Sequence, residues 1–532
     1  MSAETHQTGE KLTGYHEVFI PFPDVYEAGG PEAFSRLERP IDSGRNLIVL
    51  PFQFVEDLAL SVDKSNSYGA RETLSFVKKA TLRDNLVCAD EDLSCATYKL
   101  TGGLDICVLD TPKFSTSAGL EIGKLVNALQ EKIGAGSDVP VKLITSLDKH
   151  HIRYRNLGMI VENPGFLQVD EDIVNEGILL GSEKLQAALY SNGGSLPLES
   201  AVDILGRELF INQFVRFRAE EQDTFAVVQA SMVYNNRQRT RILNASDPLL
   251  TMLDPSEYSR GLTIGKSPVS SLVGILPQDM EQYLALQYGC ISNDVPLFFL
   301  CGKRGSGKTL LSYAFAIDSV LHYDAETRDK RGLDPRKKGG RFEQAVILKP
   351  TEVLGGKRRE VGALPGTLFQ KLRPHLRPYE SAHKTTNVSI PFEQMFMHPD
   401  FETDDFKQRH PDLKQRKING GYLPPRNVLE LVFSGFMGGD SIRNTLFMID
   451  EAQDFEPYEL KTILERMGTG CAAIITGDPF QTRNPNCNRK VNGLTSAIKH
   501  YLPKPYSGLI YLTRNYRHQI SEDTEQWHVY PR

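Results

Sequence analysis

The chain is poor in cysteine and lacks any long hydrophobic run. Its 532 residues include 7 cysteines and no CxxC pair, which argues against a disulfide framework and against a structural zinc site. The longest apolar runs, such as residues 295–301 (VPLFFLC), fall far short of the roughly 20 residues that a membrane-spanning helix needs. Residues 1–16 are polar and lack the apolar core of a secretory signal. These absences favour a cytoplasmic protein without membrane contact.

Neither the charge nor the composition indicates a strongly basic or a disordered protein. The formal net charge is −6 and the isoelectric point is about 6.1, so any bound nucleic acid must meet a local basic surface. Hydrophobic residues make up 40% of the chain and charged residues 24%, as in ordinary globular proteins. Since domains average about 150 residues, the length predicts three or four of them.

The pattern of apolar runs divides the chain into three parts. Residues 17–167 alternate between buried-strand patterns, such as LIVLPF, and helical patterns, which predicts an α/β domain with a parallel sheet. Residues 168–271 indicate a small connector of helical and β-rich segments. The alternation returns over residues 272–532 and predicts a second α/β domain, which a polar insertion near residues 379–426 interrupts.

A strand, a glycine-rich loop and a helix follow one another from residue 297 (LFFLCGKRGSGKT, residues 297–309). The segment matches G-x-x-x-x-G-K-[ST] in the context that a phosphate-binding loop requires. Backbone N–H groups of such a loop surround an anion, and the helix N-terminus adds its dipole. We expect Lys308 to reach the β- and γ-phosphates of ATP, and the Thr309 hydroxyl to ligate Mg²⁺. The nucleotide-binding residues predicted in this loop are Gly302, Gly305, Ser306, Gly307, Lys308 and Thr309.

A second strand predicts the acids that complete an ATP site. Residues 444–454 read NTLFMIDEAQD, with four apolar residues before Asp450 and Glu451. Ligands of open α/β sheets bind at the carboxyl ends of the strands. Asp450 is therefore expected to hold the metal, and Glu451 to orient and deprotonate the attacking water.

A third strand, residues 472–476 (AAIIT), is followed by Gly477-Asp478-Pro479-Phe480-Gln481. A glutamine at this strand end can sense the γ-phosphate and the attacking water, and Asp478 would support the site. The order of P-loop, DEAQ and GDPxQ indicates the helicase-like branch of P-loop ATPases. No NKxD sequence, which a guanine-specific GTPase would need, is visible.

Two flanking residues complete the predicted pocket. Gln282 lies shortly before the P-loop, and its amide can pair with both edges of adenine. Arg517 belongs to LTRNYR (residues 512–517), where a strand precedes an arginine that can contact the γ-phosphate.

These motifs make residues 272–521 resemble the PhoH family. The resemblance includes LKPTEVLGGKRREVGALPGTLFQKLRPHLRPY (residues 348–379), GDPFQTRNPNCNRKVNGL (residues 477–494) and the final LTRNYR. It implies a RecA-like P-loop ATPase that works as a homo-oligomer, a hexameric ring with nucleic acid at its centre. Two features depart from the family pattern: Lys349 stands where arginine is usual, and no RGR triplet precedes the DEAQ strand.

The N-terminal part resembles the PIN ribonuclease domain that longer members of this family carry. Residues 47–79 and 141–159 match its motifs. The resemblance implies that Asp24, Asp57 and Asp148 hold one or two Mg²⁺ or Mn²⁺ ions, which activate a water against a phosphodiester. Asp57 stands where glutamate is usual, and Asp148 lies one residue late in its motif. We therefore favour a weak or inactive nuclease.

Three functions remain open from the sequence. The first is an ATP-driven remodeller of single-stranded RNA, or of single-stranded DNA, fused to an active PIN ribonuclease. In the second, the PIN domain is catalytically dead and serves as an RNA- or protein-binding module with a regulatory role. The third is a regulatory ATPase without a nucleic-acid substrate, which the acidic isoelectric point and the missing RGR triplet favour.

Overall fold

A computed structural model describes the chain between Tyr15 and Ser521, with gaps. The residues of this range that it does not describe are 36, 38–44, 66–67, 83–84, 91–92, 102, 111–113, 117–118, 134–138, 165–168, 221, 231, 236–239, 244–247, 265–266, 270, 293, 322–340, 351–352, 355–356, 359–367, 389–391, 396–416, 419–420, 423–428, 434–441 and 485. In the described part, no helix combines the length and the apolar character that crossing a membrane requires. Six of the seven cysteines are in positions where no disulfide forms.

The N-terminal domain is built on a seven-stranded sheet with the order β3-β4-β5-β2-β1-β8-β9. Its strands are β1 (Tyr15–Pro21), β2 (Arg45–Pro51), β3 (Leu86–Asp90), β4 (Cys95–Thr101), β5 (Leu104–Leu109), β8 (Val141–Ile144) and β9 (Ile160–Glu162). Its main helices are α1 (Pro23–Gly29), α3 (Phe52–Ser65), α4 (Tyr68–Ala80), α5 (Ile122–Ile133) and α6 (Asp148–Arg155). The short helix α2 (Glu32–Ser35) follows α1.

Most of this sheet is parallel, as predicted, and one side of it is not. Strands β1, β2, β5, β8 and β9 pair in parallel, and the apolar runs of β1 and β2 are fully buried. Strands β3, β4 and β5 pair antiparallel. The connections between these three strands are too short for the crossover that parallel strands need, so the chain must reverse direction there.

The connector forms a smaller mixed sheet with the order β10-β12-β13-β16-β11. Its elements are η4 (Glu171–Gly177), β10 (Ile178–Leu180), α7 (Glu183–Ser191), β11 (Ser195–Pro197), α8 (Leu198–Leu205), β12 (Phe214–Phe217), β13 (Thr224–Gln229), β14 (Met232–Asn235), β15 (Thr240–Leu243), β16 (Leu249–Met252), α9 (Pro255–Arg260), β17 (Leu262–Ile264) and β18 (Ser267–Val269). The combination of helices and β-rich segments agrees with the sequence pattern.

The C-terminal domain contains a six-stranded, fully parallel sheet with the order β25-β20-β26-β27-β19-β28. Its strands are β19 (Leu297–Gly302), β20 (Gln344–Lys349), β25 (Leu429–Phe433), β26 (Thr445–Ile449), β27 (Ala472–Gly477) and β28 (Ser507–Leu512). Its helices include α10 (Met280–Leu284), which a π-helical turn (Ala285–Cys290) continues, α11 (Lys308–Leu321), α13 (Leu368–Thr385), α15 (Pro457–Leu464) and α16 (Gly493–Tyr501). The arrangement agrees with a RecA-like domain, and the predicted mixed α/β fold with parallel sheets is confirmed.

Helix α13 extends beyond the start of the predicted insertion. It continues through Tyr379, whose side chain is buried against the sheet, and ends at Thr385. Most of residues 386–426 lie outside the described part of the chain. The polar composition of this stretch did not reveal that its first residues belong to the core, because a single buried tyrosine carries little weight in a sequence pattern.

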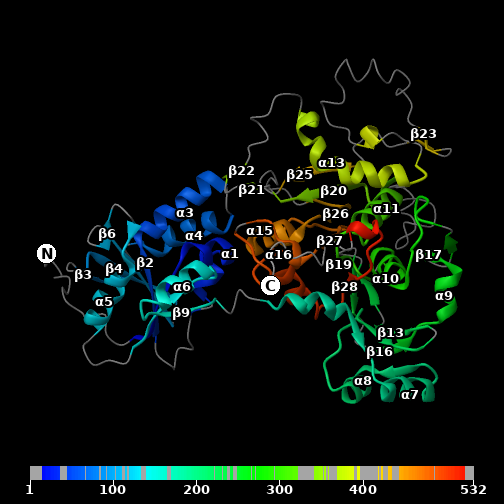
Figure 1. Cartoon of the computed structure of the whole chain (residues 1–532), viewed down its shortest axis with the longest axis horizontal. Coiled ribbons are helices and arrows are strands. Elements are labelled where there is room, and N and C mark those ends of the chain that lie inside the picture. Colours follow the sequence, from blue (N-terminus) through cyan, green and yellow to red (C-terminus); the bar gives the residue numbers. More distant parts are fainter. Residues whose placement is uncertain are drawn as a thin grey trace.

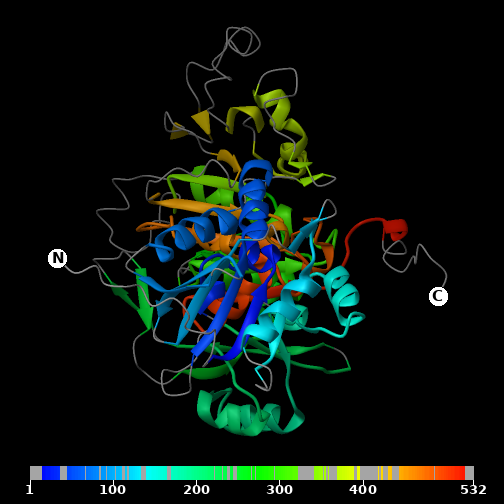
Figure 2. The same ribbon diagram turned by 90° about the vertical axis from the view of Figure 1, so that its left-hand side faces the viewer.

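The N-terminal domain packs against α15 of the C-terminal domain through α1 and α4 (Figure 1). A Cβ atom on Gly30, just after α1, would lie 2.9 Å from the ring of Tyr458, so the two domains touch closely there. Seen with the N-terminal domain in front, the connector helices α7 and α8 lie below both larger domains (Figure 2).

The connector covers the outer strand of the C-terminal sheet. The turn η4 runs against β28, and a Cβ atom on Gly177 would overlap the carbonyl oxygen of Leu509. The Asn212 side chain donates hydrogen bonds to the carbonyl oxygens of Pro505 and Ser507 at 2.9 and 2.8 Å. The connector is thereby fixed to the edge of the sheet.

Candidate nucleotide site

The predicted P-loop joins the end of β19 to the start of α11. Gly305 and Gly307 have φ angles of 77° and 94°, in the left-handed region that suits glycine. A Cβ atom on Gly305 would also overlap the side-chain oxygen of Asn515. These glycines let the loop turn tightly into α11, which begins at Lys308.

The Lys308 side chain folds over the P-loop and hydrogen-bonds to its backbone. Its Nζ donates to the carbonyl oxygens of Gly302 at 2.5 Å and of Lys303 at 2.8 Å. Burial lowers the pKa of Lys308, and the carboxylates of Asp478 and Glu451 oppose that effect. A phosphate in the loop would offer this ammonium group charged oxygens in place of two carbonyls.

Gln282 braces the P-loop from α10. Its side chain is 4% exposed, donates from Nε2 to the Ser306 carbonyl at 3.0 Å, and accepts the Gln278 N–H at 2.9 Å. Both ends of the amide are therefore occupied by protein groups, and its predicted pairing with adenine stays a prediction. Thr309 is the second residue of α11 and is half-buried.

Asp450 follows β26 and is held as a carboxylate by four donors. One oxygen accepts the Thr476 hydroxyl at 2.7 Å and the Glu451 N–H at 3.1 Å. The other accepts the Tyr379 hydroxyl at 2.7 Å and lies 3.2 Å from Lys349 Nζ. Burial favours the neutral acid, but Lys349 and the hydrogen bonds outweigh it, so the pKa of Asp450 lies below its usual value.

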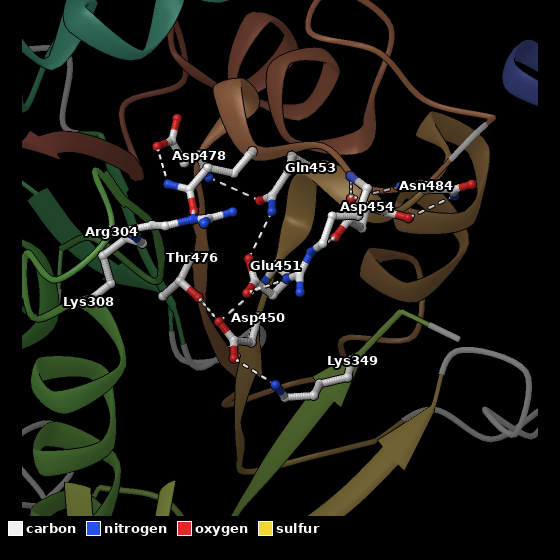
Figure 3. Close-up of polar contacts among 12 residues, drawn as sticks. Arg304, Lys308, Lys349, Asp450, Glu451, Gln453, Asp454, Thr476, Asp478 and Asn484 are labelled. Atoms are coloured by element: carbon white, nitrogen blue, oxygen red, sulfur yellow. Dashed lines mark hydrogen bonds and ion pairs between the residues drawn. The ribbon is translucent and has the colours of Figure 1, made fainter. Parts of the chain in front are cut away.

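Glu451 has both side-chain oxygens engaged (Figure 3). Gln453 Nε2 donates to one oxygen at 2.8 Å, and Arg483 Nη2 lies 2.7 Å from the other. Arg483 also lies 3.4 Å from Asp454, which accepts the Arg483 backbone N–H at 2.5 Å. The backbone of Glu451 has a φ of 56°, a conformation that side chains rarely adopt and that clusters at functional sites. The expected general base is thus held in place by an arginine.

Gln481 connects the P-loop to the end of β27. Its Oε1 accepts a hydrogen bond from Arg304 Nε at 2.5 Å, and its Nε2 donates to Asp478 at 2.5 Å. Arg304 belongs to the P-loop, so the glutamine predicted to sense the γ-phosphate lies at the phosphate loop.

Arg517 lies beside the P-loop as well. Its aliphatic carbons are near Gly305, and the neighbouring Tyr516 donates its backbone N–H to the Gly305 carbonyl at 3.0 Å. Tyr516 also hydrogen-bonds Asp279 next to α10, and Thr513 pairs with Glu281. The LTRNYR segment is therefore fixed to both the P-loop and α10, with Arg517 exposed to solvent.

Several residues of the site were not found from the sequence. Thr476 ends a predicted strand and Gln453 belongs to DEAQ, so their positions carried a signal. Tyr379 and Arg483 carried none, because only the fold brings them to Asp450 and Glu451.

Of the three predicted acids of the N-terminal domain, Asp24 and Asp57 both lie near Glu27. Asp24 accepts the Thr145 hydroxyl at 3.0 Å, and the Ser146 N–H and hydroxyl at 2.7 and 2.8 Å, at the end of β8. Asp24 and Asp57 both act electrostatically on Glu27, which the sequence reasoning missed. Asp148 begins α6, but its side chain lies outside the described part.

Among the described acids of the N-terminal domain, Glu27 has the carboxyl group whose pKa departs furthest from its usual value. Burial raises its pKa from the usual 4.5 to about 7. A hydrogen bond from Ser61 lowers the pKa, and the nearby carboxylates of Glu456, Asp24 and Asp57 raise it further. Nowhere among the described residues do three His, Cys, Asp or Glu side chains lie close enough together to hold a metal ion.

The comparisons with known proteins concern the C-terminal half. Residues 332–528 match the family model described as PhoH-like protein. Protein PhoH2 of Bacillus subtilis (strain 168) is 26% identical over 47% of this chain and 46% of its own length. The PhoH-like protein of Synechocystis sp. is 28% identical over 35% of this chain and 43% of its own. Protein PhoH2 of Thermobispora bispora is 23% identical over 53% of this chain and 52% of its own.

The chain therefore spans about half the length of the curated relatives it matches. The matched region contains β20, β26 and β27, and with them the acids and the glutamine of the site described above. Over residues 332–528, the C-terminal region of this chain is therefore similar to the PhoH family.

Proposed function

We propose that the chain is an ATPase that requires Mg²⁺ and remodels single-stranded RNA in the cytoplasm. The observation that carries the proposal is that groups from three strand ends meet at one edge of a parallel sheet. Lys308 follows β19, Asp450 and Glu451 follow β26, and Gln481 follows β27. This edge is where open α/β sheets bind nucleotides.

The residues present fit Mg²⁺-ATP. Asp450 is held ionised, and Thr309 lies in the P-loop position whose hydroxyl can ligate the metal. Bound Mg²⁺ would neutralise charge that develops on the phosphates. Lys349 now supplies the positive charge next to Asp450, and a metal there would compete with it.

Hydrolysis assigns a task to each of the remaining groups. Lys308 leaves two loop carbonyls and binds phosphate oxygens. Glu451 leaves Arg483 and accepts the proton of the attacking water. Gln481 orients that water, and Arg517 stabilises charge on the transferred phosphoryl group.

The proposed partners are single-stranded RNA and further copies of the chain. The helicase-like order of motifs supports an RNA or single-stranded DNA substrate. A hexameric ring is what the family resemblance implies.

For the N-terminal half we propose a PIN domain with weak or absent nuclease activity. The hydrogen bonds of Asp24 to Thr145 and Ser146, at the ends of two adjacent parallel strands, support the PIN assignment. Asp57 in place of the usual glutamate, and Asp148 one residue late in its motif, favour the inactive form that serves as an RNA- or protein-binding module. Cleavage of single-stranded RNA with Mn²⁺ that disappears in Asp57→Asn would overturn this choice.

The test of the main proposal is ATP turnover with and without single-stranded RNA. Lys308→Ala should abolish turnover, whereas Lys184→Ala, which removes an exposed lysine from α7, should leave it unchanged. RNA should stimulate the wild type. Turnover that Lys308→Ala retains would refute the assigned site, and turnover that RNA does not affect would favour the regulatory ATPase.

A further inference from the structure

A groove of about 780 Å³ lies between the end of α1 and the outer faces of α15 and α16. It is separate from the nucleotide site, because none of the P-loop residues lines it. We call it the interdomain groove. Its principal lining residues are Ala28, Gly29, Tyr458, Lys461, Lys499 and Tyr501.

The groove is locally basic in a chain of negative net charge. Lys461 and Lys499 contribute two exposed ammonium groups, and His500 adds an imidazole. Glu465 is the one carboxylate among the residues that line it. A polyanion is therefore favoured in this groove over a neutral or cationic ligand.

Aromatic rings lie next to these charges. Lys461 Nζ is 5.6 Å from the centroid of the Tyr458 ring. The His500 and Tyr501 rings are 4.7 Å apart and perpendicular. Both tyrosines are half-buried and line the groove. Cations interleaved with aromatic rings are the composition of sites that bind phosphates and stack unpaired bases.

The walls of the groove are held by close backbone packing. The Tyr458 ring leaves no room for a side chain at Gly30. On the opposite wall, a Cβ atom on Gly493 would lie 3.0 Å from the Phe455 carbonyl and 3.1 Å from Leu460. The volume therefore exists before any ligand binds, and ordering the walls adds little to the cost of binding.

The groove adjoins the acids of the N-terminal domain. Helix α1 carries Asp24 in its first turn and Glu27 shortly before Gly29, which lines the groove. Glu456, directly before α15, acts electrostatically on Glu27.

We propose that the interdomain groove binds single-stranded RNA, with Lys461 and Lys499 contacting phosphates and Tyr458 and Tyr501 contacting bases. The proposal rests on the proposed function, in which the chain acts on single-stranded RNA. It adds a second place of contact, outside the ATP site and between the two domains. A single strand fits better than a duplex, because stacking on a tyrosine requires an unpaired base.

The test is fluorescence anisotropy of a labelled oligouridine with the full chain across a series of salt concentrations. The double variant Lys461→Ala/Lys499→Ala is compared with Lys184→Ala/Lys384→Ala, which removes two exposed lysines from α7 and α13. Losing two phosphate contacts should make the slope of log K against log salt shallower by about 1.4. The control pair should keep the wild-type slope. ATP turnover without RNA should be the same in all three proteins.

A second measurement is chemical acetylation of lysines, read by mass spectrometry. Oligouridine should protect Lys461 and Lys499, and an RNA duplex or polyglutamate should not. If Lys461→Ala/Lys499→Ala keeps the wild-type slope of log K against log salt, and oligouridine protects neither lysine, the groove is not the RNA site. RNA-stimulated ATP turnover would be unaffected by that result. Protection by polyglutamate alone assigns the groove to an acidic protein and also overturns the proposal. If the wild type binds no RNA at any salt concentration, both the groove and the RNA function fail.

Discussion

At the scale of single residues, the ion pair between Glu451 and Arg483 limits how Glu451 can act as the proposed general base. Arg483 lies 2.7 Å from one oxygen of Glu451, and Gln453 holds the other. A carboxylate with both oxygens engaged is poorly placed to accept a proton from water. In the proposed ATPase this arrangement is a resting state, which ATP or RNA would rearrange.

We expect Glu451→Gln to bind ATP and to hydrolyse it about 10²–10⁴ times more slowly, because the amide cannot accept the proton of water. Single-turnover hydrolysis and nucleotide binding by fluorescence would check the two parts separately. Wild-type turnover in this variant would exclude Glu451 as the base.

Removing Arg483 should raise ATP turnover, whereas Glu451→Gln should lower it. Arg483→Ala is expected to raise RNA-independent turnover about two- to fivefold, the equivalent of one exposed ion pair, and to reduce the factor by which RNA stimulates it. Arg483→Lys, which keeps the charge, should fall between the two. If Arg483→Ala lowers ATP turnover equally with and without RNA, Arg483 serves only to maintain the structure around Glu451 and Asp454.

At the scale of elements, α13 is attached to the active strand by one buried hydrogen bond. Tyr379 reaches from the middle of the helix to Asp450, which ends β26, at 2.7 Å. The same helix packs on α11 behind the P-loop. The position of α13 and the charge of Asp450 are thereby coupled.

We predict that Tyr379→Phe lowers the free energy of unfolding by about 1–3 kcal/mol, because a buried carboxylate loses a donor. Amide hydrogen exchange should become faster in α13 and stay unchanged in the connector helix α7. Urea denaturation identical to that of the wild type would show that water or another donor replaces the hydroxyl.

At the scale of the whole molecule, the contact between the domains carries a titratable group. Glu27 belongs to α1 and is half-buried, and its pKa is raised to about 7 by burial first and by Glu456 and its neighbouring acids next. The folded chain therefore binds a proton on Glu27 between pH 4.5 and 7 that the unfolded chain has released. Stability from this group is complete below the lower value and is lost as the pH rises through the upper one.

The pH dependence of Glu27→Gln provides the test. Relative to this variant, the wild type should lose stability on the order of 1–3 kcal/mol between pH 5 and pH 8, since the amide does not titrate. The difference between the two urea midpoints, measured at each pH, removes the contributions of all other groups. A difference that stays constant with pH would contradict the raised pKa.

The sequence predicted the parts of the site that follow the chain locally. The P-loop, Asp450, Glu451 and Gln481 each follow a buried strand, so period and motif together indicated them. Tyr379, Arg483 and Glu27 were not predictable, because they reach their partners only through packing of distant elements. The antiparallel strands β3 and β4 were missed for a related reason: alternating strands and helices indicate a parallel sheet but not how each edge is extended.

The close packing of Gly177 against Leu509 has a consequence for how copies of this chain assemble. An exposed outer strand offers unpaired backbone groups to any passing strand, and proteins often join by continuing a sheet from one molecule into the next. Here η4 and Asn212 occupy the side of β28 where such a strand would add. Neighbouring subunits cannot continue the sheet at β28 without displacing the connector. The ring proposed above would therefore form through side-chain surfaces or the opposite end of the sheet, and strand addition is blocked at this end.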